Sequence, residues 1–391
     1  MKALFASCMA LSLCTLAGAG CSSDAQGTAD GSVQDMSSSD APSASDQGSQ
    51  DMPQSALPTE VMVMRVGAGG ASAMVSNVAT AAFIERHQIS DGSLVGQAIA
   101  LPTAASGANH ILTLSGGAAS EGALTRSADG RYILFAGYDA APGTTSVVDN
   151  AMRVAGRLSA GGAVDTTTVV DTLNGSGNFI RSAASTDGNA IWLAGVVGIA
   201  YTTLGKTGNP IAKPLGSTYN SRVLGIYGGQ LYVSRASDTS GGVNSVGTGL
   251  PTTDAVTPKQ LSGFPSTGNV LSPYGFVAFD TDATAGIDLL YIADDRTNGS
   301  GGVQRWTLNN TTWTLAGTMS VGASSGCRGL TGFASGTNHV LIATTSEAGI
   351  ASTRLVSLTD TGATPSSITA TLLATAATNT AYRGVALAPS P

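Results

Sequence analysis

The chain has 391 residues, and Gly, Ala, Ser and Thr together make up 199 of them, with 51 Gly alone. Charged residues are only 11% of the chain, against roughly 25% in an ordinary soluble domain, which excludes a long charged helix or coiled coil. With 18 Lys+Arg against 25 Asp+Glu the net charge is −7, which argues against a nucleic-acid-binding protein. A hydrophobic content of 42% is still enough to build a core.

Residues 1–20 have the features of a signal peptide. An apolar stretch from Ala3 to Ala17 is too short to span a bilayer, and the small residues Gly18-Ala19-Gly20 follow it. The next residue is Cys21, so the segment resembles a bacterial lipobox, in which the cysteine is lipidated. Ordinary cleavage after Ala19 is the alternative, since small residues also precede that bond.

Residues 21–58 are expected to form a disordered acidic tether. From residue 22 on, this segment has no aromatic residue and no Lys or Arg, and it contains six Asp: Asp24, Asp30, Asp35, Asp40, Asp46 and Asp51. Such a composition cannot bury enough apolar surface to offset the entropy of ordering. The simplest interpretation is a stalk between a lipid anchor and a globular domain, and the alternative is a disordered N-terminus without an anchor.

Residues 59–391 are predicted to form one large all-β domain. Short β-branched and aromatic runs alternate with Gly, Asn, Asp and Ser turns, and the more helix-like stretch Val78–Ile89 is also interpreted as strand. Once the first cysteines leave with the signal peptide and Cys21 carries a lipid, only Cys327 remains, so no disulfide is expected within the domain. A domain of this size can bury about 75% of its unfolded surface.

Six strong apolar strands recur along the domain, starting at Val61, Arg131, Ala190, Gln230, Leu289 and His339. Around a ring the intervals are 70, 59, 40, 59, 50 and 55 residues, which is typical of a propeller or a solenoid. A run of small residues precedes these strands, as the thin inner strands of wedge-shaped blades require. The first strand lacks such a run, and the run at Arg383–Ala388 lacks a strand after it.

These two ends complement each other, which predicts a ring closed by N- and C-terminal strands in one blade. We therefore expect a six-bladed β-propeller with four strands in each blade, with seven blades as the alternative. The phrases Leu290–Leu308 (LYIADDRTNGSGGVQRWTL) and Ser127–Tyr138 (SADGRYILFAGY) resemble the blade repeats of the NHL and YVTN propeller families. The whole domain is similar to uncharacterised exported bacterial propeller proteins. This resemblance implies a fold and a location outside the cytoplasm, but it assigns a catalytic role to no residue of this sequence.

Aligning the inner strands places six residues at one repeat position: Glu121, Arg181, Arg222, Tyr274, Arg328 and Arg383. We expect their side chains to surround one mouth of the central channel, where four guanidinium groups would attract a carboxylate, a phosphate or an acidic sugar. The alternative is that each Arg pairs with a loop carboxylate or caps the carbonyl groups of a neighbouring strand. The carboxylates considered as partners are Asp139, Asp294 and Asp295.

The best candidate for a metal site is the stretch with Asp280, Asp282 and Asp288, whose alternating carboxylates could hold one Ca²⁺. The EF-hand spacing is not met, so the alternative is a hairpin loop in which Asp side chains cap their own backbone. No other cofactor is expected.

Other chemistry-bearing residues have structural explanations. His87, His110 and His339 lie far apart and are expected to be hydrogen-bonded or partly exposed strand residues. The GxSxG match at 322–326 lacks the strand-turn-helix context of a nucleophile elbow. Cys327 is expected to be a small buried residue of an inner strand.

The sequence therefore predicts a lipid-anchored protein of the bacterial cell envelope, at the outer membrane or cell surface, with secretion as the alternative. Its propeller would be a monomeric binding module for a protein, a glycan or a small anionic ligand. An enzyme such as a lactonase, lyase or hydrolase at the channel mouth is the second hypothesis, and it rests on analogy of fold alone. A purely structural spacer is the third.

Overall fold

The computed structural model describes residues 56–391, apart from residues 72, 172, 174–176, 217–218, 237–240, 267–270, 298, 323–324 and 348–351. Residues 56–391 form one compact unit. The signal peptide, Cys21 and the tether up to residue 55, which were predicted from the sequence, lie outside the described residues. No helix in the described part of the chain is long and apolar enough to cross a lipid bilayer.

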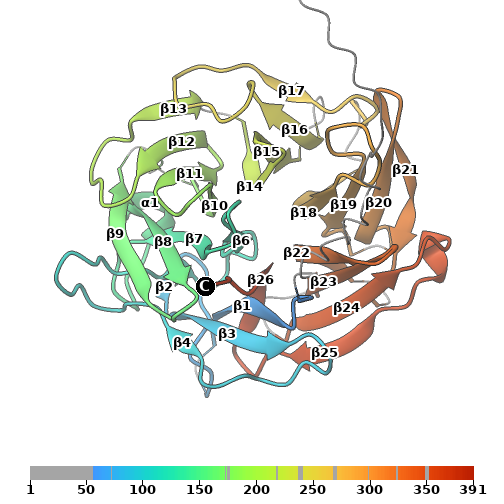
Figure 1. The fold of residues 1–391 in the computed structure, drawn as a ribbon. Helices are drawn as coiled ribbons and strands as arrows, with labels where there is room; N and C mark the ends of the chain where they lie inside the picture. Colours follow the sequence, from blue (N-terminus) through green and yellow to red (C-terminus); the bar gives the residue numbers. More distant parts are fainter. Residues whose placement is uncertain are drawn as a thin grey trace, which may run out of the picture. The chain divides into compact units, whose positions relative to one another are not determined.

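The described residues form six four-stranded antiparallel sheets arranged as blades around a central axis (Figure 1). We number the blades 1 to 5 from β6 onward and call the sheet of β26, β1, β3 and β4 the closing blade. The innermost strands are β26 (Ala381–Leu387), β6 (Thr125–Arg126), β10 (Ile180–Ser185), β14 (Ser221–Tyr227), β18 (Pro273–Phe279) and β22 (Gly326–Ser335). The second strands are β1 (Glu60–Val66), β7 (Tyr132–Tyr138), β11 (Ala190–Gly195), β15 (Gln230–Arg235), β19 (Leu289–Asp294) and β23 (Asn338–Ser346).

The third strands are β3 (Ala82–Gln88), β8 (Arg153–Ser159), β12 (Gly198–Thr203), β16 (Gly242–Val246), β20 (Gly302–Asn309) and β24 (Arg354–Asp360). The outer strands are β4 (Ile99–Ala100), β9 (Val164–Val170), β13 (Ala212–Leu215), β17 (Pro258–Gln260), β21 (Thr312–Met319) and β25 (Thr371–Thr375). Outside the blades lie β2 (Ala79–Thr80), paired with β5 (Leu114–Ser115), the single-turn helix α1 (Val147–Asn150) and the 3₁₀ turn η1 (Pro365–Ser367).

The predicted six-bladed propeller is confirmed, since the described residues form six four-stranded blades and not seven. The ring closes as predicted, because β26 from the C-terminal end pairs with β1 from the N-terminal end, with Val61 opposite Leu387. The stretch Val78–Ile89 is strand, as expected. The outer side of β3 (Ala82–Gln88) is paired in two short pieces, an isolated bridge between His87 and Leu94 and the two-residue strand of Ile99 and Ala100.

The apolar core is divided into six clusters, and each lies between two adjacent blades. The cluster between blades 2 and 3, for example, packs Trp192 and Ala194 against Leu224 and Val233. The cluster that joins blade 5 to the closing blade packs Ile342 against Val63 and Val385 in the same way. Because every blade is apolar on both faces, burial is complete only when the ring is closed.

Candidate functional site

A β-bulge recurs at one level of five inner strands. In each of them the inner strand contains one residue more than the second strand with which it pairs. A bulge of this kind bends the strand and redirects a side chain. The bulges fall at or beside the five residues that the sequence alignment had placed at one repeat position: Arg181, Arg222, Tyr274, Arg328 and Arg383.

Glycines beside these bulges hold neighbouring inner strands close together. A Cβ atom at Gly384 would lie 2.2 Å from the backbone nitrogen of Leu124 and 2.5 Å from the carbonyl oxygen of Gly122. A Cβ atom at Gly329 would lie 2.7 Å from the carbonyl oxygen of Arg383. Only glycine fits such backbone approaches, so the sequence keeps the inner strands in contact at the level of the bulges.

The first two arginines of the ring reach across to the next blade. Arg181 is buried, and its Nη1 donates hydrogen bonds to Oδ1 of Asn220 at 2.6 Å and to the carbonyl of Ser221 at 3.0 Å. Arg222 Nη1 donates to the carbonyl of Pro273 at 2.9 Å in the same manner. These two guanidinium groups therefore cap strand ends of a neighbouring blade, which was the alternative considered from the sequence.

Tyr274 lies between two of the arginines. The Arg222 guanidinium is 4.0 Å from the centre of the Tyr274 ring, and the Arg328 guanidinium is 5.5 Å from it. Arg328 also forms an ion pair with Asp295 at 2.9 Å. Cation–π contacts and the ion pair fix the orientation of the aromatic ring at this mouth.

Glu121 and Arg383 are the two most buried charged groups of the ring. Glu121 is 3% exposed and accepts hydrogen bonds from the backbone N–H of Ser115 at 2.9 Å and from the hydroxyl of Tyr138. Burial raises the pKa of Glu121 to about 7, against the opposing effect of these hydrogen bonds. The protonated form of Glu121 is therefore accessible near neutral pH.

Arg383 is 5% exposed, and its Nη2 donates to the carbonyl of Gly116 at 3.1 Å. Its Nε has no hydrogen-bond partner among the described residues. Burial, together with the nearby charge of Arg328, lowers the pKa of Arg383 to about 10, although the charge of Glu121 opposes the shift. A buried cation with an unused donor is costly unless an anion compensates it.

A cavity of about 300 Å³ opens at this ring and runs along the inner strands. Glu121, Tyr274, Arg328 and Arg383 line it at the ring, and residues of all six inner strands continue its wall. Arg181 and Arg222 do not line the cavity, although Arg222 packs on the ring of Tyr274, which does. The structure thus brings all six predicted residues together, but it exposes only four of them to the cavity.

The predicted acidic partners of the arginines are only partly right. Asp295 does pair with Arg328, but Asp139 hydrogen-bonds His110 at 2.8 Å and Asp294 pairs with Arg296 at 2.8 Å. Both carboxylates therefore bond to residues within or beside their own blade and not to an arginine of the ring.

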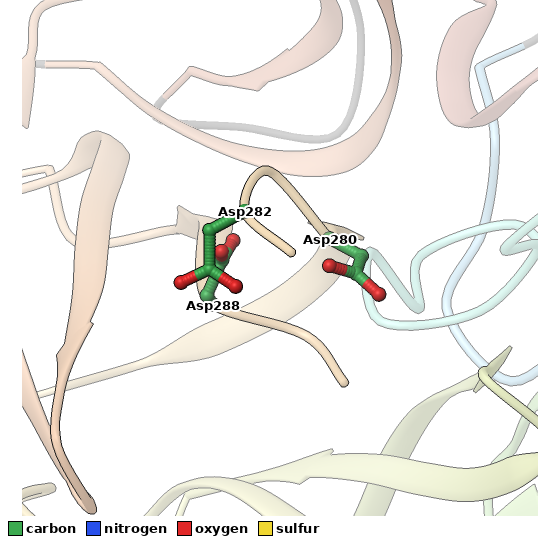
Figure 2. A group of neighbouring side chains, drawn as sticks. All are labelled: Asp280, Asp282 and Asp288. Carbon is green, nitrogen blue, oxygen red and sulfur yellow. The ribbon is translucent and has the colours of Figure 1, made fainter. Parts of the chain in front are cut away.

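The three predicted metal ligands also come together, on the hairpin loop between β18 and β19 (Figure 2). One carboxylate oxygen from each of Asp280, Asp282 and Asp288 lies within 4.8 Å of the others. The loop already uses these groups, since Asp288 accepts a hydrogen bond from the backbone N–H of Thr281 at 3.0 Å and Asp282 from that of Thr284 at 2.6 Å. Calcium binding at this loop stays a prediction from the sequence.

The remaining candidates have structural roles. Nδ1 of His87 hydrogen-bonds the carbonyl of Gly92 at 2.8 Å, and His339 packs on Phe279 with ring centres 4.6 Å apart. Cys327 is buried and donates to the carbonyl of Gly302, and burial raises its pKa well above the usual range. Such a thiol is not activated as a nucleophile. Ser324, the central serine of the GxSxG match, lies outside the described residues.

The sequence did not reveal a second, polar hollow of about 460 Å³ between blades 4 and 5. Its wall includes Arg305 and Asp360, joined by an ion pair of 2.8 Å, and the hydroxyl of Tyr291 donates to the same carboxylate at 2.8 Å. These residues lie on strands of two different blades, so no spacing in the sequence could have identified them.

Comparisons with known proteins add no family. No family model matches the chain, and no curated protein matches it by sequence. The resemblance to NHL and YVTN repeats is therefore limited to the blade pattern.

Similar solved structures exist at low identity. One is named a "putative 6-phosphogluconolactonase" from Bacteroides fragilis NCTC 9343, with 13% identity, 82% of each chain covered and a TM-score of 0.42. A protein with the same name from Bacteroides uniformis ATCC 8492 has 13% identity and a TM-score of 0.41, with 82% of this chain and 84% of that chain covered. Apo AztD from Citrobacter koseri has 12% identity and a TM-score of 0.29, over 80% of this chain and 70% of its own.

Proposed function

We propose that the propeller is a binding module that holds a small anionic ligand at the channel mouth formed by the arginine ring. The observation that carries the proposal is Arg383, whose guanidinium lies in the wall of a cavity and makes one hydrogen bond among the described residues, from Nη2 to the carbonyl of Gly116. The ring contains four Arg, Arg383 among them, against Glu121 and Asp295, so it has an excess of two positive charges, or three when Glu121 is protonated. Arginine in such a position recognises carboxylates and phosphates through paired hydrogen bonds.

Calorimetric titration with acetate and inorganic phosphate tests this proposal. The wild-type domain should bind at least one of the two anions. Arg383→Met should weaken that binding at least tenfold, because it removes the charge and keeps most of the volume. Arg131→Met is the matched control, since Arg131 is exposed on a blade hairpin away from the ring, and its binding should equal that of the wild type. The proposal fails if neither anion binds, or if both variants bind like the wild type.

One observation favours the second hypothesis, an enzyme at the same mouth. A carboxyl group with a pKa of about 7, buried beside a cavity, is suited to act as a general acid or base. A panel of lactones and esters would reveal this activity, and Glu121→Gln should then abolish turnover while leaving anion binding intact. Absence of turnover across the panel would leave the binding module as the function.

We further propose that the protein is held in the bacterial cell envelope by a lipid on Cys21. The support is the lipobox-like end of the apolar segment and the acidic composition of residues 22–58. Metabolic labelling with a palmitate analogue should mark the full-length protein in its host and should be lost in Cys21→Ala. Labelling that persists in the variant would contradict the anchor.

A further inference from the structure

The channel beyond the arginine ring has a different chemistry from the ring itself. Along the inner strands its wall is built largely by apolar side chains, among them Val223, Phe276, Val277, Leu330 and Leu387. These side chains keep 5–9% of their surface exposed, whereas the residues at the centres of the blade interfaces are close to 0%. The remaining exposed surface of these residues therefore faces the cavity that they line.

Val223 gives the clearest indication of this orientation. It is 7% exposed and lines the cavity, yet it belongs to none of the six interblade clusters formed by the described residues. The next residue, Leu224, does belong to the cluster between blades 2 and 3. A buried valine that packs into no blade interface has the channel as its neighbour.

The opposite end of the cavity is polar again. Arg126 lines it there, and its guanidinium donates to the carbonyl of Gly130 at 3.0 Å and to the hydroxyl of Ser390 at 2.6 Å. The cavity thus has cations at one end, apolar walls in the middle and a hydrogen-bonded cation at the other end. Its volume of about 300 Å³ is at the lower end of the range for small-molecule sites.

We infer that the ligand of the channel is an amphipathic monocarboxylate, with its carboxylate at Arg383 and Arg328 and its hydrocarbon body along the apolar wall. This inference rests on the proposed function and adds the class of ligand. A wholly polar anion would leave the wall of Val223 and Leu330 in contact with water, whereas a hydrocarbon body removes both surfaces from water.

The backbone edges of the inner strands also border the channel, because each inner strand is the last strand of its sheet. The gain for each methylene is therefore less than the full transfer value.

The test is a chain-length series of carboxylates measured by calorimetry on the wild-type domain: acetate, butanoate, hexanoate and octanoate. Burial of one methylene contributes about 0.8 kcal/mol at most, which corresponds to about a fourfold gain in affinity. We expect a gain of about two- to fourfold for each added methylene, until the chain fills the cavity.

A variant of the wall provides the second readout. Val223→Thr keeps the shape of the side chain but replaces one methyl group with a hydroxyl, which makes the wall more polar. It should therefore weaken octanoate binding several-fold and leave acetate binding unchanged. Val75→Thr is the matched control, because Val75 is 57% exposed and lies outside the cavity, and its octanoate binding should equal that of the wild type.

The possible failures can be told apart. If acetate and phosphate bind at the ring but affinity does not rise with chain length, the amphipathic ligand is overturned and the proposed anion site stands. If no carboxylate and no phosphate binds, both proposals fail. A rise with chain length that Arg383→Met leaves unchanged would also overturn the inference, because the carboxylate would then lie elsewhere.

Discussion

At the scale of single residues, burial governs the charges of the ring. Glu121 and Arg383 lie in the same low-dielectric surroundings, and each pKa moves toward the neutral form of its group. Glu121 loses its charge near neutral pH, whereas Arg383 stays protonated because its lowered pKa is still about 10. The mouth therefore becomes more positive as the pH falls through about 7.

The first prediction concerns the pH dependence of stability that Glu121 causes. Its folded-state pKa of about 7 lies above the ordinary 4.5, so the folded protein holds a proton that the unfolded chain releases between these values. The contribution to the free energy of unfolding is full below about pH 4.5 and is lost as the pH rises through about 7. It amounts to on the order of 3 kcal/mol.

Urea unfolding at pH 5 and pH 8 measures this effect. The wild type should lose more stability over this interval than Glu121→Gln, which carries no titrating proton. Glu60→Gln, at an exposed ion pair of β1, should keep the wild-type dependence. Equal pH dependence in the wild type and Glu121→Gln would contradict the prediction.

The positions of these residues could be inferred from the sequence, but their contacts could not. The repeat placed Arg181 and Arg328 at one level because the blade pattern is periodic and the bulge recurs in five of the six blades. The partner of Arg181 is Asn220, a residue with a left-handed backbone at the start of the next blade, and no periodicity marks it. Side-chain partners depend on packing between blades, which the sequence of one blade does not contain.

At the scale of strands, the closing blade is stabilised by a polar cluster that bridges both ends of the chain. Arg65 of β1 forms an ion pair with Glu85 of β3, and His87 contacts the same carboxylate at 3.1 Å. Tyr382 of β26 packs edge-on against His87, with ring centres 5.7 Å apart. Burial raises the pKa of Glu85, but hydrogen bonds from His87 and Arg65 lower it more, so the carboxylate stays charged.

The second prediction is that Glu85→Gln lowers the free energy of unfolding by about 2 kcal/mol, because it leaves the buried His87 and the mostly buried Arg65 without their counter-charge. The figure is below that of a fully buried pair, since the two ion-paired side chains are 14% and 12% exposed. Asp165→Asn, in the more exposed Arg157 pair of blade 1, should cost less than 1 kcal/mol. Urea unfolding of both variants checks this order, and a larger loss in Asp165→Asn would contradict it.

Strands that are buried on both faces were predicted well, and outer strands were not. The second strands have a central run of apolar residues, such as Leu289–Ala293 in β19, so their composition alone identifies them. The short β4 and β17 are partly exposed and follow turns, so neither alternation nor apolar content distinguishes them from loops. The pairing of β2 with β5 falls outside the blade repeat and had no periodic signal.

At the scale of the whole molecule, the ring depends on one strand from the C-terminal end. Without β26, β1 would present an unpaired edge, and the clusters on both sides of the closing blade would be open to water. The third prediction is that deletion of residues 381–391 abolishes the cooperatively folded state.

Size-exclusion chromatography and a thermal melt measure this outcome, and we expect aggregates and no sharp transition. Deletion of residues 389–391 is the matched control, because it removes the contact of Ser390 with Arg126 but leaves β26 whole. That control should elute like the wild type and have nearly the wild-type melting temperature. If the longer deletion also elutes and melts like the wild type, the ring is stable without β26 and the prediction is wrong.

Closure by β26 also sets the order of events during synthesis. Val61 pairs with Leu387, more than three hundred residues away in the sequence, so the ring cannot close until nearly the whole domain has left the ribosome. Contacts of such separation are slow to form, and the nascent chain stays incomplete for the entire time of its elongation. A chain that must pass unfolded through a membrane, as the proposed anchor at Cys21 requires, benefits from this delay. Under the proposed anchor, the strand that completes the mature ring would therefore also delay folding until the chain has been exported.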